Sequence, residues 1–143
     1  MNQAKVLLVD DEVPFVETMT KRLTKRDLDV SSAFSGMEAL KTLQTNPNFD
    51  IVILDVKMPQ MDGIETLQEI KKRFPLLEVI MLTGHATVES AIEGMRLGAF
   101  DYLMKPCDMD LLISKVMDAK AKKRKHEEKI IDAELKEITM RRP

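Results

Sequence analysis

The sequence predicts an α/β fold, a doubly wound parallel sheet of five strands with five helices on its two faces. Short apolar segments alternate with segments of helical periodicity along about the first 120 residues, which is the pattern of β-α units that pair in parallel. Polar side chains directly follow four of the apolar segments, at the strand ends where such sheets bind ligands. A length of 143 residues suits one domain of this kind.

Five apolar segments have the length and composition of buried strands. They are rich in valine, isoleucine and leucine, as expected for parallel strands that are covered on both faces. The segment at 51–54 is the most apolar of them, and the segment at 28–33 is the least. We expect strands at residues 4–9, 28–33, 51–54, 79–82 and 100–104.

The first two helices begin at recognisable signals. Pro14 suits the first turn of a helix over residues 14–26, because a residue there needs no amide hydrogen bond. Ser35 and Glu38 have the spacing of a capping box. They predict the start of a helix that continues through Leu43.

The other three helices have equally local signals. A third helix runs from Ile64 to Phe74 and ends before a proline. A fourth begins at Thr87 and ends near Gly98, which suits a left-handed C-cap. Asp108 predicts the N-cap of the fifth helix. The fourth helix has apolar residues at helical spacing on one face, namely Val88, Ala91, Ile92 and Met95.

The composition excludes several classes of protein. The chain contains one cysteine, Cys107, so neither an intramolecular disulfide nor a cysteine-cluster metal site can form. No apolar run approaches the roughly 18 residues of a membrane-spanning helix. The N-terminus lacks the basic and apolar segments of a secretory signal. We therefore expect a cytoplasmic protein.

The most informative feature is a set of polar residues at the carboxyl ends of four different strands. They are Asp10, Asp11, Asp55, Thr83 and Lys105. Each one alone is compatible with an ordinary turn or cap. Because the carboxyl ends of parallel strands meet at one edge of a sheet, together they predict a binding site at that edge.

Three carboxylates at one edge must be neutralised. Two unit charges about 4 Å apart repel by about 4 kcal/mol at an effective dielectric constant near 20, so either one carboxyl keeps its proton or a cation binds. Oxygen ligands without histidine or cysteine favour Mg²⁺. Mg²⁺, Lys105 and Thr83 together can hold a phosphoryl group, and a carboxylate among them can be the nucleophile. Asp55 is favoured, because it ends the most buried strand in the middle of the sheet.

Four motifs resemble the receiver domain of two-component response regulators. They are Leu-Val-Asp-Asp-Glu at 8–12, Leu-Asp-Val-Lys-Met-Pro-Gln-Met-Asp-Gly at 54–63, Met-Leu-Thr-Gly-His-Ala at 81–86 and Gly-Ala-Phe-Asp-Tyr-Leu-Met-Lys-Pro at 98–106. All four have the order and spacing of that family, and the resemblance covers about residues 3–120. It implies a flavodoxin-like sheet with the strand order 2-1-3-4-5.

The resemblance also assigns the phosphorylation chemistry. Asp55 would be the phosphoacceptor. Asp10 and Asp11 would hold Mg²⁺ together with Asp55 and the backbone carbonyl of Lys57. Lys105 would pair with a phosphoryl oxygen, and in this family the bond from that lysine to the following proline is cis.

Further residues would transmit the change or tune it. Thr83 would move to donate a hydrogen bond to the phosphoryl group, and Tyr102 would move inward as the switch aromatic. Lys57 and His85, two residues after Asp55 and Thr83, would flank the path of the attacking water. For these two residues, ordinary solvated side chains remain an alternative interpretation.

The partners follow from the same resemblance, which is to domains of bacterial signalling systems. A sensor histidine kinase or a histidine phosphotransfer protein would donate the phosphoryl group. The surface of the fourth helix, fifth strand and fifth helix would then bind a downstream protein or a second copy of the chain. We expect no enzymatic activity beyond Mg²⁺-dependent self-phosphorylation from a phosphodonor and self-dephosphorylation.

The end of the chain differs in charge from the rest. Residues 1–113 contain 12 basic and 18 acidic side chains, whereas residues 114–143 contain 10 basic and 6 acidic ones. We expect a receiver domain over residues 1–120, a charged helical tail over 121–143 and no separate output domain. The tail is either a docking or dimerisation segment or a solvated helix. Residues 120–125 form a basic cluster, with five basic residues in six. Nucleic-acid binding is not expected, because no aromatic residue accompanies this cluster and no reader fold is present.

Three other functions are alternatives to a stand-alone receiver. The chain could be a phosphorelay intermediate, or a receiver fragment of a larger transcriptional regulator. A phosphatase of the haloacid dehalogenase type also uses an aspartate nucleophile with Mg²⁺. It requires a second aspartate two residues after the first, but Glu12 follows Asp10 and Lys57 follows Asp55 at that spacing.

Overall fold

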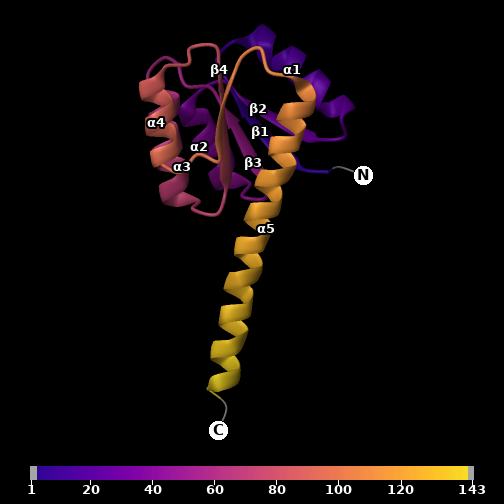
Figure 1. Cartoon of the computed structure of the whole chain (residues 1–143), viewed down its shortest axis with the longest axis vertical. Coiled ribbons are helices and arrows are strands. Elements are labelled where there is room, and N and C mark those ends of the chain that lie inside the picture. Colours follow the sequence, from indigo (N-terminus) through magenta and orange to yellow (C-terminus); the bar gives the residue numbers. More distant parts are fainter. Residues whose placement is uncertain (1–2, 142–143) are drawn as a thin grey trace.

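The computed structural model describes residues 3–141, and five strands within that range form a parallel sheet in the order β2-β1-β3-β4-β5 (Figure 1). The strands are β1 (Lys5–Val9), β2 (Asp29–Ala33), β3 (Ile51–Leu54), β4 (Glu78–Thr83) and β5 (Asp101–Met104). The helices are α1 (Val13–Lys25), α2 (Gly36–Thr45), α3 (Gly63–Arg73), α4 (Val88–Arg96) and α5 (Met109–Met140). The α/β fold and its strand order are confirmed.

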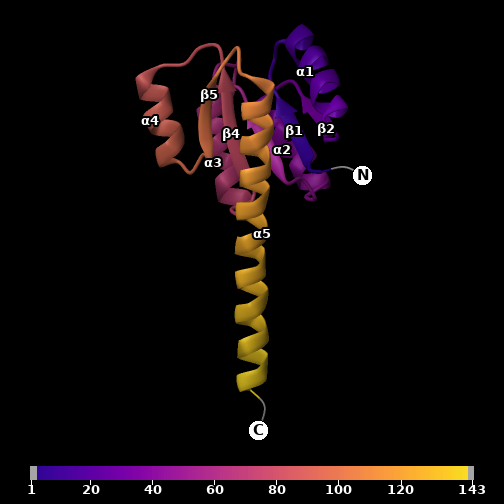
Figure 2. The ribbon, with the colours of Figure 1, turned by 45° about the vertical axis from the view of Figure 1, so that its right-hand side comes forward.

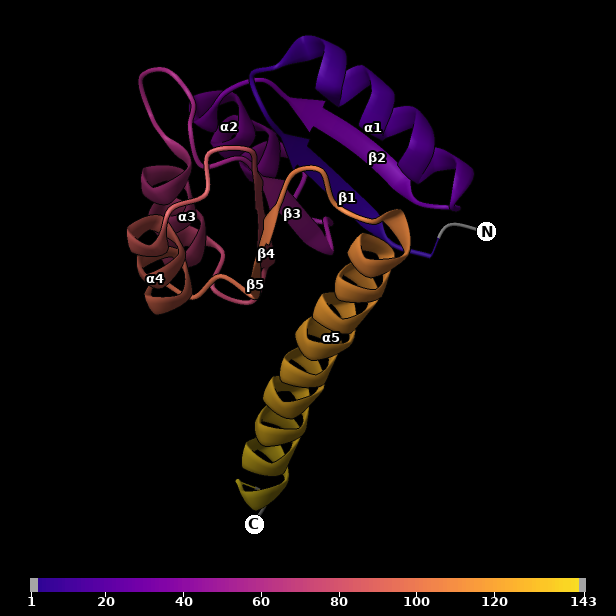
Figure 3. The same cartoon turned by 45° about the horizontal axis from the view of Figure 1, so that its top comes forward.

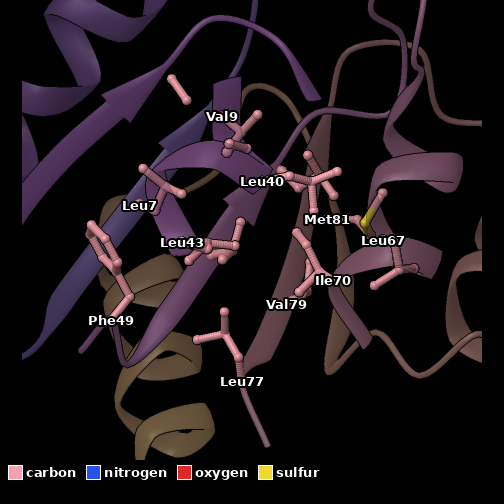
Figure 4. Close-up of a cluster of buried hydrophobic side chains, with 14 of the residues drawn as sticks. Leu7, Val9, Leu40, Leu43, Phe49, Leu67, Ile70, Leu77, Val79 and Met81 are labelled. Carbon is pink, nitrogen blue, oxygen red and sulfur yellow. The ribbon is translucent and has the colours of Figure 1, made fainter. Parts of the chain in front are cut away.

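The sheet separates two apolar clusters, because neighbouring residues of a strand point to opposite faces. Leu7 and Val9 of β1 pack with side chains of α2 and α3 (Figure 4). Val6 and Leu8 of the same strand pack with side chains of α1 and α5. Figure 3 shows these two pairs of helices on opposite sides of the sheet. Every residue of β3 and β4 is buried, which explains why these segments are the most continuously apolar.

Most helix ends follow the signals in the sequence. The Ser35 hydroxyl accepts the Glu38 amide, and the Asp108 carboxylate likewise caps α5. Gly98 follows α4 with φ +100°, which is the expected left-handed conformation. The capping box differs in one respect, because the Glu38 carboxylate accepts the Phe34 amide and not that of Ser35.

The apolar stripe that the sequence places on one face of α4 is largely exposed to solvent. Val88, Ile92 and Met95 are 72%, 56% and 47% exposed. Among the described residues of α4, Gly94 is the buried one, and it faces the Tyr102 ring. The helix therefore contacts the sheet through a glycine, and its larger apolar side chains project outward.

A buried carboxylate, that of Glu78, lies at the amino end of β4. Glu78 is 2% exposed, and the ammonium groups of Lys71 and Lys122 lie 3.7 and 3.4 Å from its two oxygens. Burial lowers the pKa of Lys71, and the charge of Glu78 opposes that effect. These ion pairs join β4 to α3 and to the part of α5 that leaves the sheet.

Beyond the sheet, α5 continues as one helix that projects away from the body (Figures 1 and 2). Its basic cluster is partly engaged, because Lys122 pairs with Glu78, Lys123 pairs with Glu127, and Lys120 donates to the Gln3 carbonyl. The outer turns carry exposed apolar side chains, namely Ile130, Ile131, Leu135 and Ile138.

Glu78→Gln should lower the free energy of unfolding by about 2 kcal/mol, because it leaves two lysines beside a neutral amide. Chemical denaturation of the full chain measures this change. Glu93→Gln is the matched control, since Glu93 forms an exposed pair with Arg96; it should change stability by no more than about 0.5 kcal/mol. Equal effects of the two substitutions would contradict the role given to Glu78.

Candidate functional site

The strand ends position the predicted site residues by extending the backbone pairing of the sheet. The amide of Asp10 donates to the Ala33 carbonyl, and the amide of Asp55 donates to the Val9 carbonyl. The amide of Lys105 donates to the Thr83 carbonyl. The backbone is therefore fixed up to the residue that carries each functional side chain, at the carboxyl edge of the sheet.

Three aspartates gather at this edge. Each of Asp10, Asp11 and Asp55 offers a carboxylate oxygen, and these oxygens lie within 4.8 Å of one another. Asp10 and Asp55 are only 1% and 2% exposed, whereas Asp11 is half-buried. Burial raises the pKa of Asp10, and hydrogen bonds from Lys105 and from the amide of Glu12 oppose that rise.

Asp55 presents an oxygen that has no partner among the described residues. No donor within residues 3–141 is within hydrogen-bonding distance of its Oδ1. A buried carboxylate oxygen without a partner is costly, and a hard divalent cation or an electrophile would remove that cost. The all-oxygen donor set of Asp10, Asp11 and Asp55 fits Mg²⁺.

Lys105 lies between the acidic residues and connects β5 to them. Its ammonium is 2.6 Å from Asp10 Oδ2, 3.3 Å from Glu12 Oε1 and 4.0 Å from Asp55 Oδ2. Burial lowers the pKa of Lys105, but the hydrogen bond to Asp10 and the negative charges outweigh it, so the pKa is raised. The lysine therefore stays positively charged beside Asp55. The expected cis bond to Pro106 is present.

Thr83 and Tyr102 occupy different surroundings. The Thr83 hydroxyl is buried and accepts the amide of His85 at 3.0 Å. Tyr102 is half-buried at the other side of β5, where its hydroxyl is 2.6 Å from Ser90 Oγ of α4. Thr83 is thus connected to Lys105 through the backbone bond between them, whereas Tyr102 contacts α4.

An open hollow reaches Asp11 of the acidic cluster. Its volume is about 380 Å³, and its lining is formed by Asp11, Glu12, Lys57, Met58, Pro59 and His85. Lys57 and His85 thus lie at the entrance to the site and not within the acidic cluster.

Two residues that contact Lys105 were not predicted from the sequence. Glu12 directly follows the paired aspartates, and that position could have indicated its contact with Lys105. The Phe15 ring lies 3.8 Å from the Lys105 ammonium. Nothing local in the sequence predicts this contact, because the two residues are brought together by the fold.

Comparison with known protein families agrees with the geometry of this site. The family model of the response regulator receiver domain matches residues 6–117. The chain belongs to this family. Receiver domains act in two-component signalling, as the four motifs implied, and the function expected from the sequence is confirmed at that level.

Curated relatives of this receiver domain are longer proteins. Transcriptional regulatory protein ZraR of Escherichia coli O157:H7 is 38% identical over 134 residues, which are 94% of this chain and 29% of ZraR. DNA-binding transcriptional regulator NtrC of Klebsiella pneumoniae is 36% identical over 116 residues, which are 81% of this chain and 24% of NtrC. The chain therefore spans less than a third of the length of these relatives.

Solved receiver structures have the same fold. A response regulator receiver domain protein from Clostridium thermocellum superposes with a TM-score of 0.81 at 38% identity, covering 85% of this chain and 97% of its own. Chemotaxis protein CheY4 of Vibrio cholerae superposes with a TM-score of 0.75 at 31% identity, covering 81% and 98%. Among residues 3–141, no helix is long and apolar enough to cross a membrane.

Asp10→Asn should weaken Mg²⁺ binding about tenfold or more, because it removes one negative charge from the proposed ion site. Isothermal titration calorimetry with MgCl₂ measures the dissociation constant. Asp132→Asn makes the same change in an exposed residue of the α5 extension and should leave the constant unchanged. Equal affinity of Asp10→Asn and the unmodified chain would show that the acidic cluster is not the ion site.

Proposed function

We propose that Asp55 accepts a phosphoryl group and that this event switches the protein. The main support for this proposal is the environment of the Asp55 carboxylate. Asp55 is 2% exposed, and its Oδ1 has no hydrogen-bond donor among residues 3–141. Its Oδ2 lies 4.0 Å from the Lys105 ammonium. A carboxylate with one free oxygen beside a fixed positive charge suits nucleophilic attack on phosphorus.

The donor is a phosphohistidine on a sensor histidine kinase or a histidine phosphotransfer protein. An Asp55 oxygen attacks the phosphorus, a P–O bond forms, and the P–N bond breaks as the imidazole leaves with its electron pair. Attack of water on the phosphorus later restores the carboxylate and releases inorganic phosphate. The protein thus promotes only its own phosphorylation and dephosphorylation, and a cytoplasmic location suits such a donor.

Mg²⁺ is the cofactor that this acidic site fits. Asp10, Asp11, Asp55 and the backbone carbonyl of Lys57 would hold the ion, which supplies positive charge to the oxygens of the transferred group. Lys105 adds a second positive charge from β5. Lys57 and His85 at the entrance of the hollow would affect how water reaches the phosphoryl group.

Phosphorylation would be transmitted through Thr83 and Tyr102. A phosphoryl group adds about -1.5 to -2 charges and three strong acceptors. The Thr83 hydroxyl accepts the His85 amide, so its own proton is available for a phosphoryl oxygen. Movement of Thr83 toward that oxygen would open space for Tyr102, which must first release Ser90. The surface of α4, β5 and α5 would change shape as a result.

This surface would bind a downstream protein or a second copy of the chain. It exposes apolar side chains of α4 and β5, including Val88, Ile92 and Met104. Residues 1–120 would form the receiver domain, and residues 121–143 a helical tail for docking or dimerisation. Contact with another protein, without membrane or nucleic acid, would pass on the signal.

Asp55→Asn should abolish phosphorylation by acetyl phosphate in MgCl₂, because an amide replaces the nucleophile. Intact mass spectrometry is the measurement, with the unmodified chain expected to gain one phosphoryl group. Asp101→Asn is the matched control: it removes the carboxylate that pairs with Lys115, and this variant should still gain one phosphoryl group. Phosphorylation of Asp55→Asn to the same extent as the unmodified chain would remove Asp55 from its proposed role.

Tyr102→Phe should increase the rate of phosphorylation by acetyl phosphate by up to about fivefold. The bond to Ser90 is worth about 1 kcal/mol, and its loss favours the arrangement that binding of the phosphoryl group also favours. The time course of phosphorylation by mass spectrometry measures the rate. Ser90→Ala should have a similar effect, and the double variant should add little. A slower or unchanged rate in Tyr102→Phe would contradict this coupling.

A further inference from the structure

The Lys105 ammonium is held from two sides. Carboxylates of Asp10, Glu12 and Asp55 lie 2.6 to 4.0 Å away. The Phe15 ring lies 3.8 Å from the same nitrogen, measured to the ring centroid. At that distance, the negative face of an aromatic ring attracts a cation.

The Phe15 ring is held in place by the helix that carries it and by the core. It lies in the first turn of α1, two residues after Val13, where the helix begins at the carboxyl edge of the sheet. Its ring is half-buried and packs against the apolar cluster between the sheet and helices α1 and α5. The ring is thus part of the core on one side and a contact of the site on the other.

Lys105 needs such a contact because its backbone alone does not fix its ammonium. The main chain is held by the bond from its amide to the Thr83 carbonyl, but a lysine side chain has four rotatable bonds and loses much conformational entropy when it is fixed. In the unphosphorylated protein, the carboxylates hold it. Any of them that turns toward a cation or a phosphoryl group releases part of that hold.

We propose that Phe15 is a positioning residue for Lys105 during phosphorylation of Asp55. The inference rests on the proposed function and goes beyond it. The attraction of a cation to a ring face depends weakly on direction. The ammonium can therefore exchange Asp10 for a phosphoryl oxygen while it stays over the ring, on the side of Asp55.

A leucine at this position would keep an apolar side chain against the core but would not attract the ammonium. Phe15→Leu therefore separates positioning from packing. Phe15→Tyr keeps the ring and should keep the function. Phe100→Leu is the matched control, because Phe100 also lies beneath a lysine, with Lys122 at 5.7 Å, but at a distance from the phosphorylation site.

The experiment measures the rate of phosphorylation by acetyl phosphate in MgCl₂ for the full chain and each variant. Phe15→Leu should slow it about fivefold, whereas Phe15→Tyr and Phe100→Leu should stay within about twofold of the unmodified chain. In a Lys105→Ala background, Phe15→Leu should cause no further loss, because the residue acts through the lysine. A purely structural role would lower the rate in both backgrounds.

A spectroscopic measurement tests the contact itself. The ring should shift the NMR signals of the Lys105 side-chain protons upfield, and Phe15→Leu should remove that shift while thermal unfolding shows that the variant is folded. Wild-type rates in Phe15→Leu, or signals of Lys105 unmoved by the substitution, would overturn the inference on Phe15 and leave the phosphorylation of Asp55 intact. Absence of phosphorylation in the unmodified chain would instead overturn the proposed function, and the inference with it.

Discussion

The repulsion among three carboxylates at one edge of the sheet is the constraint on which the site depends. Asp10, Asp11 and Asp55 bring oxygens within 4.8 Å of one another, and two of these residues are almost fully buried. Two charges about 4 Å apart cost about 4 kcal/mol at an effective dielectric constant near 20. Backbone pairing of β1 and β3 holds the aspartates in place, so the chain must supply positive charge. Lys105 does so from β5, and a bound cation would complete the neutralisation.

The same constraint links the site to the outer surface. A phosphoryl group on Asp55 would change the charge beside Lys105, which directly follows β5, and near Thr83, which ends β4. That helix is only loosely attached to the sheet, since Gly94 is its buried residue among those described and its large apolar side chains are exposed. A small displacement of Tyr102 would therefore change a surface that few packing contacts resist. In the proposed mechanism, this arrangement would couple a local electrostatic event to a change of shape.

The sequence predicts best what depends on neighbouring residues. Periodicity and strand-end polarity locate the strands, the caps at Ser35 and Asp108, and the residues of the acidic site, because parallel strands bring their carboxyl ends together. The outward face of α4 could not be predicted, since apolar spacing identifies a face but not whether anything covers it. The contact of Phe15 with Lys105 depends on how α1 packs, 90 residues away in the chain. The basic cluster of α5 was likewise ambiguous, because its pairing of Lys122 with Glu78 requires the fold.

We expect the buried Asp55 carboxylate, and no other acidic residue of the cluster, to carry the phosphoryl group. Borohydride reduces an acyl phosphate to an alcohol, so it marks the phosphorylated side chain permanently. The direct measurement is peptide mass spectrometry of the chain after treatment with acetyl phosphate, MgCl₂ and borohydride. We expect residue 55 to be converted to homoserine. Conversion at residue 10 or 11, or no conversion at residue 55 in a chain that carries a phosphoryl group, would contradict it.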